Sequence, residues 1–153
     1  MTETTPISAL DAAWLHRGAI DQLNAEFVAC LDEGRPADLA ALVCPDVVYR
    51  SGKQVLSSAT ELVAFFEARS GKGRQTRHMG SGLRITMTGA TTAKGRSVWM
   101  SYACNEVGAP GPARAYMVAD FVDEYRRGDD GAWRLQSRDV LPVFRNADLA
   151  PPP

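Results

Sequence analysis

The first part of the chain has apolar side chains at helical spacing. Between Ser8 and Asp32 they recur every three or four positions, and Gly34 with Pro36 supplies a stop signal, so we expect one long helix or two nearly continuous ones. The residues of this apolar stripe are Leu10, Trp14, Ile20, Leu23, Phe27 and Leu31.

Shorter elements are expected to follow. Residues 36–43 begin with proline at a tolerated first-turn position and predict a short helix that Pro45 ends. The β-branched and aromatic run 47–50 predicts a short strand. A third helix is expected from a Ser58 or Thr60 cap to the Ser70-Gly71 pair.

After Gly73 the pattern changes to long segments rich in β-formers. They cover about 77–90, 93–107, 113–127 and 133–144, and are separated by turn signals at 108–112 and 128–131. Helices first and strands afterwards indicate the α+β class. We expect the N-terminal helices to pack on a strongly curved, mainly antiparallel sheet that forms a cone-shaped barrel with an apolar pocket.

Composition narrows the range of partners. The chain has 153 residues, 45% of them hydrophobic, and a formal net charge of −1, which predicts one domain over 1–153 with loose ends at about 1–7 and 147–153. Because it lacks a basic excess, we expect no nucleic-acid or membrane partner. We expect the partners to be small molecules or proteins.

Several cofactor and compartment signals are missing from the sequence. Cys30, Cys44 and Cys104 are odd in number and far apart, which favours reduced thiols and a cytoplasmic location. No signal-peptide pattern is present at the start. Ser70-Gly71-Lys72-Gly73 lacks the P-loop spacing, and the scattered histidines and cysteines give no metal-ligand pattern. We therefore expect neither a metal nor another cofactor.

The order and spacing of several motifs resemble the SnoaL-like branch of the nuclear transport factor 2-like superfamily, from about Leu10 to Phe144. The motifs that carry the resemblance are Ala19-Ile20, Phe27, Leu31-Asp32-Glu33-Gly34, Pro45-Asp46-Val47-Val48-Tyr49, Arg77-His78, Asp123-Glu124-Tyr125-Arg126-Arg127, Gly131-Ala132-Trp133-Arg134-Leu135 and Arg138. The resemblance implies a cone-shaped pocket, often in a dimer. With it we expect a small hydrophobic molecule as partner and a homodimer joined through the sheet. This fold is shared by ketosteroid isomerases, scytalone and bile-acid dehydratases, a hexachlorocyclohexane dehydrochlorinase, polyketide cyclases and an epoxide hydrolase, and by non-catalytic dioxygenase subunits and transport factors.

The resemblance also implies catalytic residues. Several of these lyases use an aspartate at the end of the first helix with a histidine on the first long strand, which matches Asp32 and His78. A tyrosine early in the first strand of scytalone dehydratase matches Tyr49, whereas Phe27 stands where many relatives have tyrosine. Histidine suits this work because its ordinary pKa falls near neutrality, and a carboxylate on one ring nitrogen leaves the other free to take a proton.

Each candidate also has a structural interpretation. His78 could be a core histidine, Asp32 an exposed helix end and Tyr49 a half-buried strand aromatic that donates no bond to a substrate. Strand alternation places His78 with Gly80 and Gly82, away from Leu83 and Ile85, unless a bulge at the glycines resets the register.

The remaining candidates concern substrate binding. Asp120 could be a carboxylate on an apolar face, and Arg138 could bind a substrate anion or simply pair with Asp120 or Asp123. Phe27, Met100 and Tyr116 are expected to line the pocket. The basic cluster Arg69, Lys72, Arg74 and Arg77 is typical of a solvated loop, although it could attract an anionic substrate or a carrier phosphopantetheine.

We therefore favour a cofactor-independent lyase or isomerase. His78 would abstract a proton from a small hydrophobic, cyclic substrate, Asp32 would orient it, and Tyr49 or Arg138 would stabilise the oxyanion. The alternatives are a non-catalytic binding or oligomerising subunit, and an epoxide or ester hydrolase in which Asp32 or Asp120 activates water.

Overall fold

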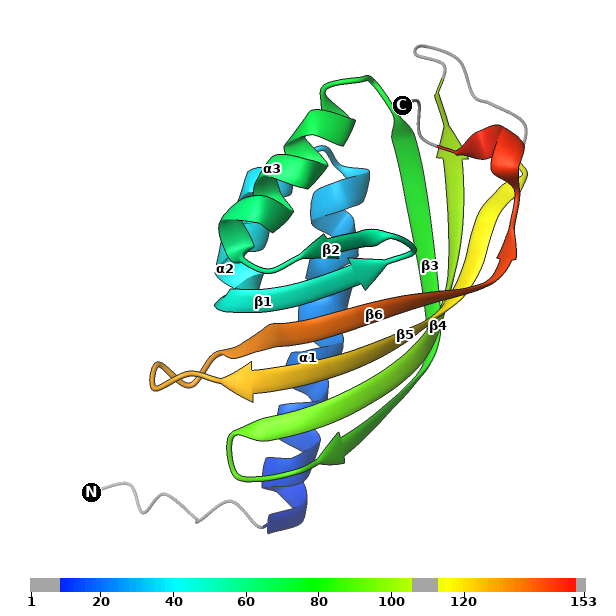
Figure 1. Cartoon of the computed structure of the whole chain (residues 1–153). Coiled ribbons are helices and arrows are strands. Elements are labelled where there is room, and N and C mark those ends of the chain that lie inside the picture. The colour runs from blue at the N-terminus through cyan, green and yellow to red at the C-terminus, as the bar shows by residue number, and fades with distance from the viewer. Residues whose placement is uncertain (1–8, 106–112, 151–153) are drawn as a thin grey trace.

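Three α-helices cover the concave face of a six-stranded sheet in the computed structural model, which describes residues 9–105 and 113–150 (Figure 1). The helical elements are α1 (Ala9–Asp32), the 3₁₀ turn η1 (Pro36–Asp38), α2 (Leu39–Leu42), α3 (Ala59–Ser70) and the 3₁₀ turn η2 (Ala147–Leu149). The strands are β1 (Val43–Ser51), β2 (Gln54–Leu56), β3 (Gln75–Met87), β4 (Thr92–Cys104), β5 (Ala115–Arg127) and β6 (Trp133–Arg145).

The sheet has the order β2-β1-β6-β5-β4-β3. All neighbouring pairs are antiparallel except β1 and β6, which run parallel, so the expectation of a mainly antiparallel α+β fold is confirmed. The long strands bend strongly around the helices (Figure 1), but the edge strands β2 and β3 do not pair among the described residues. The sheet is therefore an open cone rather than a closed barrel.

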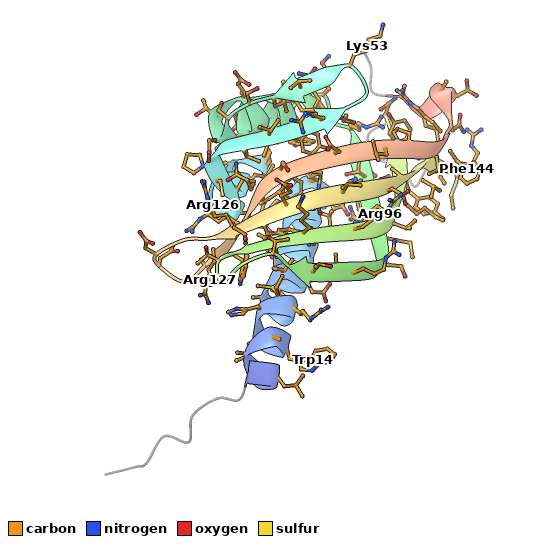
Figure 2. The ribbon with its side chains drawn as sticks, turned by 60° about the horizontal axis from the view of Figure 1, so that its bottom comes forward. Trp14, Lys53, Arg96, Arg126, Arg127 and Phe144 are labelled. Atoms are coloured by element: carbon orange, nitrogen blue, oxygen red, sulfur yellow. The ribbon has the colours of Figure 1, made fainter. Side chains whose placement is uncertain are left out.

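The long predicted helix is confirmed as α1, although its buried stripe is shorter than predicted. Ile20, Leu23 and Phe27 face the sheet and are less than 10% exposed, whereas Leu10 and Trp14 are 69% and 66% exposed. Figure 2 shows Trp14 on the end of α1 that extends past the sheet. The apolar residues at helical spacing therefore extend into a part of α1 that the sheet does not cover.

The first strand is longer than predicted. β1 begins at Val43, and its pairing with β6 is irregular between Val43 and Val48, the stretch that contains Pro45. Proline cannot donate a ladder hydrogen bond and is tolerated at such an irregularity. β1 then turns at Gly52, whose φ of 61° favours glycine, into the short strand β2, which we did not predict.

The strand that carries His78 contains a bulge at its glycines. Pairing of β3 with β4 shifts between Ser81 and Arg84, and Gly82 has φ 66°. His78 and Gly80 therefore face the helices together with Leu83 and Ile85. The space beside Gly80 is filled by Trp99, because a Cβ there would lie 2.6 Å from that ring.

A buried polar network joins α1 to the sheet. Arg138 Nε and Nη2 each donate to Asp123 at 2.8 Å, and Arg138 Nη2 also donates to the Asn24 side chain. Tyr125 donates to Asp123 at 2.6 Å and accepts from Asn24 at 2.8 Å. All four side chains are at most 3% exposed, so this network fixes the middle of α1 against β5 and β6.

Several smaller expectations concern the rest of the chain. Cys30, Cys44 and Cys104 form no disulfide with one another. In the expected loose end from 147, the Leu149 and Ala150 carbonyl oxygens accept hydrogen bonds from Arg74 and Asn105, both at 2.9 Å, and the looseness of this end stays a prediction. The expected loose start at 1–7 and turn at 108–112 lie outside the described residues. Within the described ranges no helix is long and apolar enough to cross a membrane.

Candidate active site

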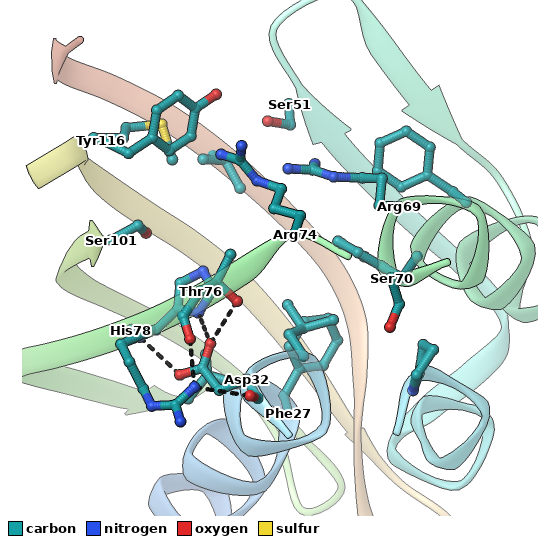
Figure 3. A pocket seen from close by; sticks show the side chains of 18 of the residues that line it. Phe27, Asp32, Ser51, Arg69, Ser70, Arg74, Thr76, His78, Ser101 and Tyr116 are labelled. Atoms are coloured by element: carbon teal, nitrogen blue, oxygen red, sulfur yellow. Dashed lines mark hydrogen bonds and ion pairs between the residues drawn. The ribbon is translucent and has the colours of Figure 1, made fainter. Parts of the chain in front are cut away.

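A cavity of about 780 Å³ lies between the helices and the curved sheet. It is lined by α1, the β1–β2 turn, α3 and the inner face of β3 to β6 (Figure 3). Five of the predicted site residues reach it: Phe27, Asp32, Tyr49, His78 and Tyr116. Residues 51 positions apart in sequence, Phe27 and His78, thus share one chamber.

Asp32 and His78 form a direct pair at one end of this cavity. Asp32 Oδ1 lies 2.7 Å from His78 Nδ1, and Asp32 Oδ2 accepts the His78 backbone N–H at 2.8 Å. Thr76 donates its hydroxyl to Asp32 Oδ1 at 2.8 Å. Both side chains of the pair are shielded, with exposed fractions of 11% for Asp32 and 14% for His78.

The hydrogen bonds to Asp32 indicate that its carboxyl group is ionised and which ring nitrogen of His78 carries a hydrogen. Burial would raise the pKa of Asp32, but the hydrogen bonds and charge of His78 and the Thr76 hydroxyl outweigh it, so the pKa lies below its ordinary value. An ionised carboxylate only accepts hydrogen bonds. His78 Nδ1 therefore carries a hydrogen, and in the neutral form of the ring the lone pair lies on Nε2.

The end of α1 explains why an aspartate lies here. A carboxylate at a helix C-terminus meets the helix dipole unfavourably, and three donors from β3 offset that cost. Gly34, with φ 72°, ends the helix directly after it, and Arg77 Nη1 donates to the Asp32 carbonyl at 2.9 Å. Asp32 thus docks the end of α1 on β3.

Tyr49 presents a phenol to the same cavity. Its ring packs edge-on against Phe66 with centroids 5.7 Å apart, and the residue lines the cavity. Burial raises the pKa of Tyr49 above its ordinary value, although the charges of Arg138 and Arg69 oppose this. The phenol therefore keeps its proton at neutral pH and can donate a hydrogen bond.

Sequence reasoning missed Thr76 and Ser101. Ser101 is 3% exposed, lines the cavity, and has a buried hydroxyl without a partner in the described part of the chain. It is directly opposite His78 in the β3–β4 register, a pairing that places Cβ atoms about 4.5–5.5 Å apart. Only the strand register brings this serine to the histidine, and no local motif marks it.

A family model described as a SnoaL-like domain matches residues 12–139. The chain belongs to the SnoaL-like domain family. Asp32, Tyr49, His78 and Ser101 all lie within the matched range.

Solved structures share this SnoaL-like fold at low sequence identity. A candidate scytalone dehydratase from Novosphingobium aromaticivorans DSM 12444 is 20% identical, with a TM-score of 0.79 over 90% of each chain. A type 2 hexachlorocyclohexane dehydrochlorinase is 18% identical, with a TM-score of 0.75 over 91% of this chain and 92% of that one. The β subunit of a candidate aromatic-ring-hydroxylating dioxygenase from N. aromaticivorans DSM 12444 is 22% identical, with a TM-score of 0.75 over 93% of this chain and 99% of that one.

The assignment of Arg138 to the pocket of this SnoaL-like chain is wrong. Arg138 is 1% exposed, does not line the cavity, and is held by Asp123 between the rings of Phe27 and Phe121, at 4.7 and 4.6 Å. Burial alone would lower the pKa of Arg138, but the charge and hydrogen bonds of Asp123 raise it above its ordinary value. Arg138 therefore has a structural role, packed between Phe27 and Phe121 of the cavity wall.

Asp120 and Met100 were also assigned to the wrong face. Pairing aligns Asp120 with Val98 and Leu141, side chains that are about half exposed, and its carboxylate binds Arg96 at 2.6 Å. Met100 is 36% exposed and follows Trp99, which faces the helices. Because side chains alternate along a strand, both residues point to the outer face of the sheet.

No group of three histidine, cysteine, aspartate or glutamate side chains in residues 9–105 and 113–150 is arranged to hold a metal ion. The expectation of a metal-free and cofactor-free protein stays a prediction.

Proposed function

We propose that this protein is a cofactor-independent lyase or isomerase that removes a carbon-bound proton with His78. The observation that carries the proposal is the 2.7 Å bond between Asp32 Oδ1 and His78 Nδ1 at the wall of the cavity. A base must be within hydrogen-bond reach of the proton that it takes and must have a free lone pair. His78 Nε2 meets the second condition because Asp32 occupies Nδ1.

The proposed first step is proton transfer to His78. The substrate C–H bond breaks, its proton goes to Nε2, and its electron pair moves to an adjacent carbonyl oxygen to give an enolate. The imidazolium that forms is stabilised by the Asp32 carboxylate, which already accepts its Nδ1–H. In an isomerase the proton returns to another carbon, whereas in a lyase the enolate expels a leaving group from the neighbouring carbon.

The negative oxygen needs donors, and two hydroxyls are suited to supply them. Tyr49 and Ser101 both line the cavity, and the buried Ser101 hydroxyl has no partner among the described residues. Donors that are fixed before the reaction stabilise a developing oxyanion without reorganising. In our proposal the Tyr49 and Ser101 hydroxyls donate to the oxyanion, because Phe27 has no hydroxyl and Arg138 is buried outside the cavity.

The cavity fits a small, largely apolar molecule. Its volume of about 780 Å³ is in the usual range for small-molecule sites, and four phenylalanines line it: Phe27, Phe65, Phe66 and Phe121. These aromatic walls favour a hydrophobic ring, the substrate type expected from the sequence.

The comparisons support an elimination in particular. Two of the similar structures are a candidate scytalone dehydratase and a hexachlorocyclohexane dehydrochlorinase, names that describe loss of water and of hydrogen chloride. Both losses begin with removal of a carbon-bound proton or proceed together with it. A dehydratase or dehydrochlorinase type of reaction therefore takes precedence over cyclisation in our proposal.

The arrangement gives less support to a carboxylate-based hydrolase. Both oxygens of Asp32 already accept hydrogen bonds from Thr76 or His78, and Asp120 lies on the outer face, paired with Arg96. Neither carboxylate is placed to hold a nucleophilic water inside the cavity.

We also propose that the outer face of the sheet joins two copies of the chain. Its exposed apolar side chains include Val98, Met100, Leu141 and Phe144. Apolar side chains gathered on one sheet face are typical of protein interfaces.

Deuterium exchange tests the proposed chemistry on a panel of compounds rather than on one chosen substrate. The purified protein is incubated in D₂O, without added cofactor, with cyclic ketones and their β-hydroxy and β-chloro derivatives. We expect at least one compound to exchange a carbon-bound hydrogen for deuterium, or to lose water or chloride, faster than without protein, as followed by ¹H NMR. If the protein binds these compounds and accelerates none of these changes, the proposed function is wrong.

A further inference from the structure

The cavity wall is much more basic than the protein as a whole. The formal net charge of the chain is −1, yet the described lining residues include five basic side chains, Lys53, Arg69, Arg74, Arg77 and Arg145, and a single carboxylate, Asp32. That carboxylate is engaged by His78 and Thr76. The positive charge of the wall is therefore not balanced by the described residues of the cavity.

Most arginines outside the cavity form ion pairs with carboxylates. Six of them outside the cavity have a carboxylate oxygen within 3.1 Å: Arg35, Arg50, Arg96, Arg126, Arg134 and Arg138. Arg69, Arg74 and Arg145 have none among the described residues. Arg17, Arg84, Arg114 and Arg127, outside the cavity, also have no carboxylate oxygen within this distance in the described chain, so the cavity is distinguished by having several such guanidinium groups on one wall.

Arg74 is held in place by neutral groups only. It donates to the Asn105 side chain and, at 2.9 Å, to the Leu149 carbonyl, and its guanidinium lies 5.0 Å from the centre of the Tyr116 ring. Its Nε is buried without a partner in the described part of the chain. Burial and the charge of Arg69 lower the pKa of Arg74, which reflects two like charges close together in a shielded place.

Arg69 and Arg145 complete the group. Arg69 lies over Phe65 and Phe66 at 5.4 and 6.0 Å, and Arg145 lies 5.7 Å from the Tyr116 ring, which Arg74 also contacts. Figure 3 shows the guanidinium groups of Arg69 and Arg74 side by side near Tyr116, away from the Asp32–His78 pair. An anion between them would relieve the repulsion and accept hydrogen bonds from planar donors.

The position of this group relative to His78 follows from the strand. Arg74, Thr76 and His78 are two residues apart in sequence and all line the cavity. Four residues of extended chain separate the Cα atoms of Arg74 and His78 by about 13 Å. The long side chain of Arg74 covers part of this distance. A ligand with a ring against the phenylalanines could therefore contact His78 at one end and the arginines at the other.

We infer that the cavity has an anion subsite formed by Arg69, Arg74 and Arg145, and that the substrate is an apolar ring compound carrying one carboxylate or phosphate group. The substrate class rests on the proposed function, whereas the subsite is a statement about binding alone. Three members of the basic cluster around Gly71 and Gly73 thus line the cavity, Arg69, Arg74 and Arg77, and we assign the first two of them to the subsite.

Isothermal titration calorimetry with matched probes tests the subsite. The full-length protein is titrated with 2-naphthoate, 2-naphthyl phosphate and the neutral 2-naphthamide. We expect one or both anions to bind about tenfold or more tightly than the amide, since hydrogen bonds to charged groups are the stronger ones. Preference for the carboxylate or for the phosphate identifies the anion that the subsite selects. If neither anion binds more tightly than the amide, the inference is wrong.

Charge-matched variants locate the effect. Arg69→Gln should lower the affinity for the preferred anion about tenfold and leave the amide unchanged, because Arg69 makes no hydrogen bond in the described chain that its loss would break. Arg84→Gln removes the same charge from an exposed residue of β3 outside the cavity and should have little effect. Equal losses in the two variants would contradict the subsite.

The two proposals fail independently. Binding is measured without turnover, and His78→Ala should keep the preference for the anion because His78 lies away from the arginines (Figure 3). A preference that persists in a protein without any exchange activity would reject the proposed function alone. Turnover of neutral compounds without a preference for anions would reject the subsite alone.

Discussion

Replacing His78 with alanine is expected to lower kcat/KM for a substrate found by deuterium exchange by about 10²–10⁴-fold, the usual contribution of a positioned base. The physical reason is the loss of the Nε2 lone pair from the cavity wall, whose described lining residues include no second histidine. The fold should persist, since the backbone N–H of residue 78 still donates to Asp32 Oδ2. Steady-state kinetics and circular dichroism of the variant provide the measurement.

A matched control for His78→Ala is available at the next residue. Met79 is 63% exposed and its side chain points away from the cavity, so Met79→Ala should keep wild-type turnover. If His78→Ala retained turnover within a factor of two of Met79→Ala, His78 would not be the base.

The largest expected change in stability comes from Asp123. Asp123→Ala should lower the free energy of unfolding by about 3–5 kcal/mol, because it leaves the buried guanidinium of Arg138 without its counter-charge. Tyr125 also loses the acceptor of its hydroxyl. The measurement is urea-induced unfolding followed by tryptophan fluorescence.

The outer face of the sheet offers the control for that variant. Asp120 binds Arg96 at 2.6 Å, a similar pair by chemistry, but Asp120 and Arg96 are 24% and 52% exposed. Asp120→Ala should therefore cost only about 0–1 kcal/mol. Similar costs for Asp120→Ala and Asp123→Ala would show that burial of the Arg138–Asp123 pair does not determine its contribution.

The helices and long strands followed from local patterns, and the exceptions have physical causes. Of the two expected caps of α3, Ser58 and Thr60, Ser58 is the one that caps the helix, because its hydroxyl accepts the Glu61 N–H at 3.2 Å. Strand β2 was not predicted, because three residues are too few to show the alternation of apolar and polar residues of a strand. The parallel β1–β6 pair was not predicted either, since strand partners depend on topology rather than on local sequence.

The Asp32–His78 pair was expected from the family resemblance and not from local pattern, since separation in sequence does not give the distance between two side chains. The candidate site was not predictable at strand positions, where the face to which a side chain points determines whether it reaches the cavity. The two faces of β5 are equally apolar, so Asp120 could be placed on either one until the pairing with β4 and β6 fixed it. Ser101 and Thr76 reach the site through β3 and its partner strand, and only the register shows this.

The tautomer of His78 tests the central claim most directly, because the proposed base exists only if Asp32 holds the hydrogen on Nδ1. The chain has two histidines, so ¹⁵N-labelled protein with His16→Gln gives ring signals from His78 alone. In spectra of the neutral imidazole we expect Nδ1 to carry the hydrogen and Nε2 to show the shift of a nitrogen with a free lone pair. A hydrogen on Nε2 instead would contradict the account, since His78 would then present no lone pair to the cavity.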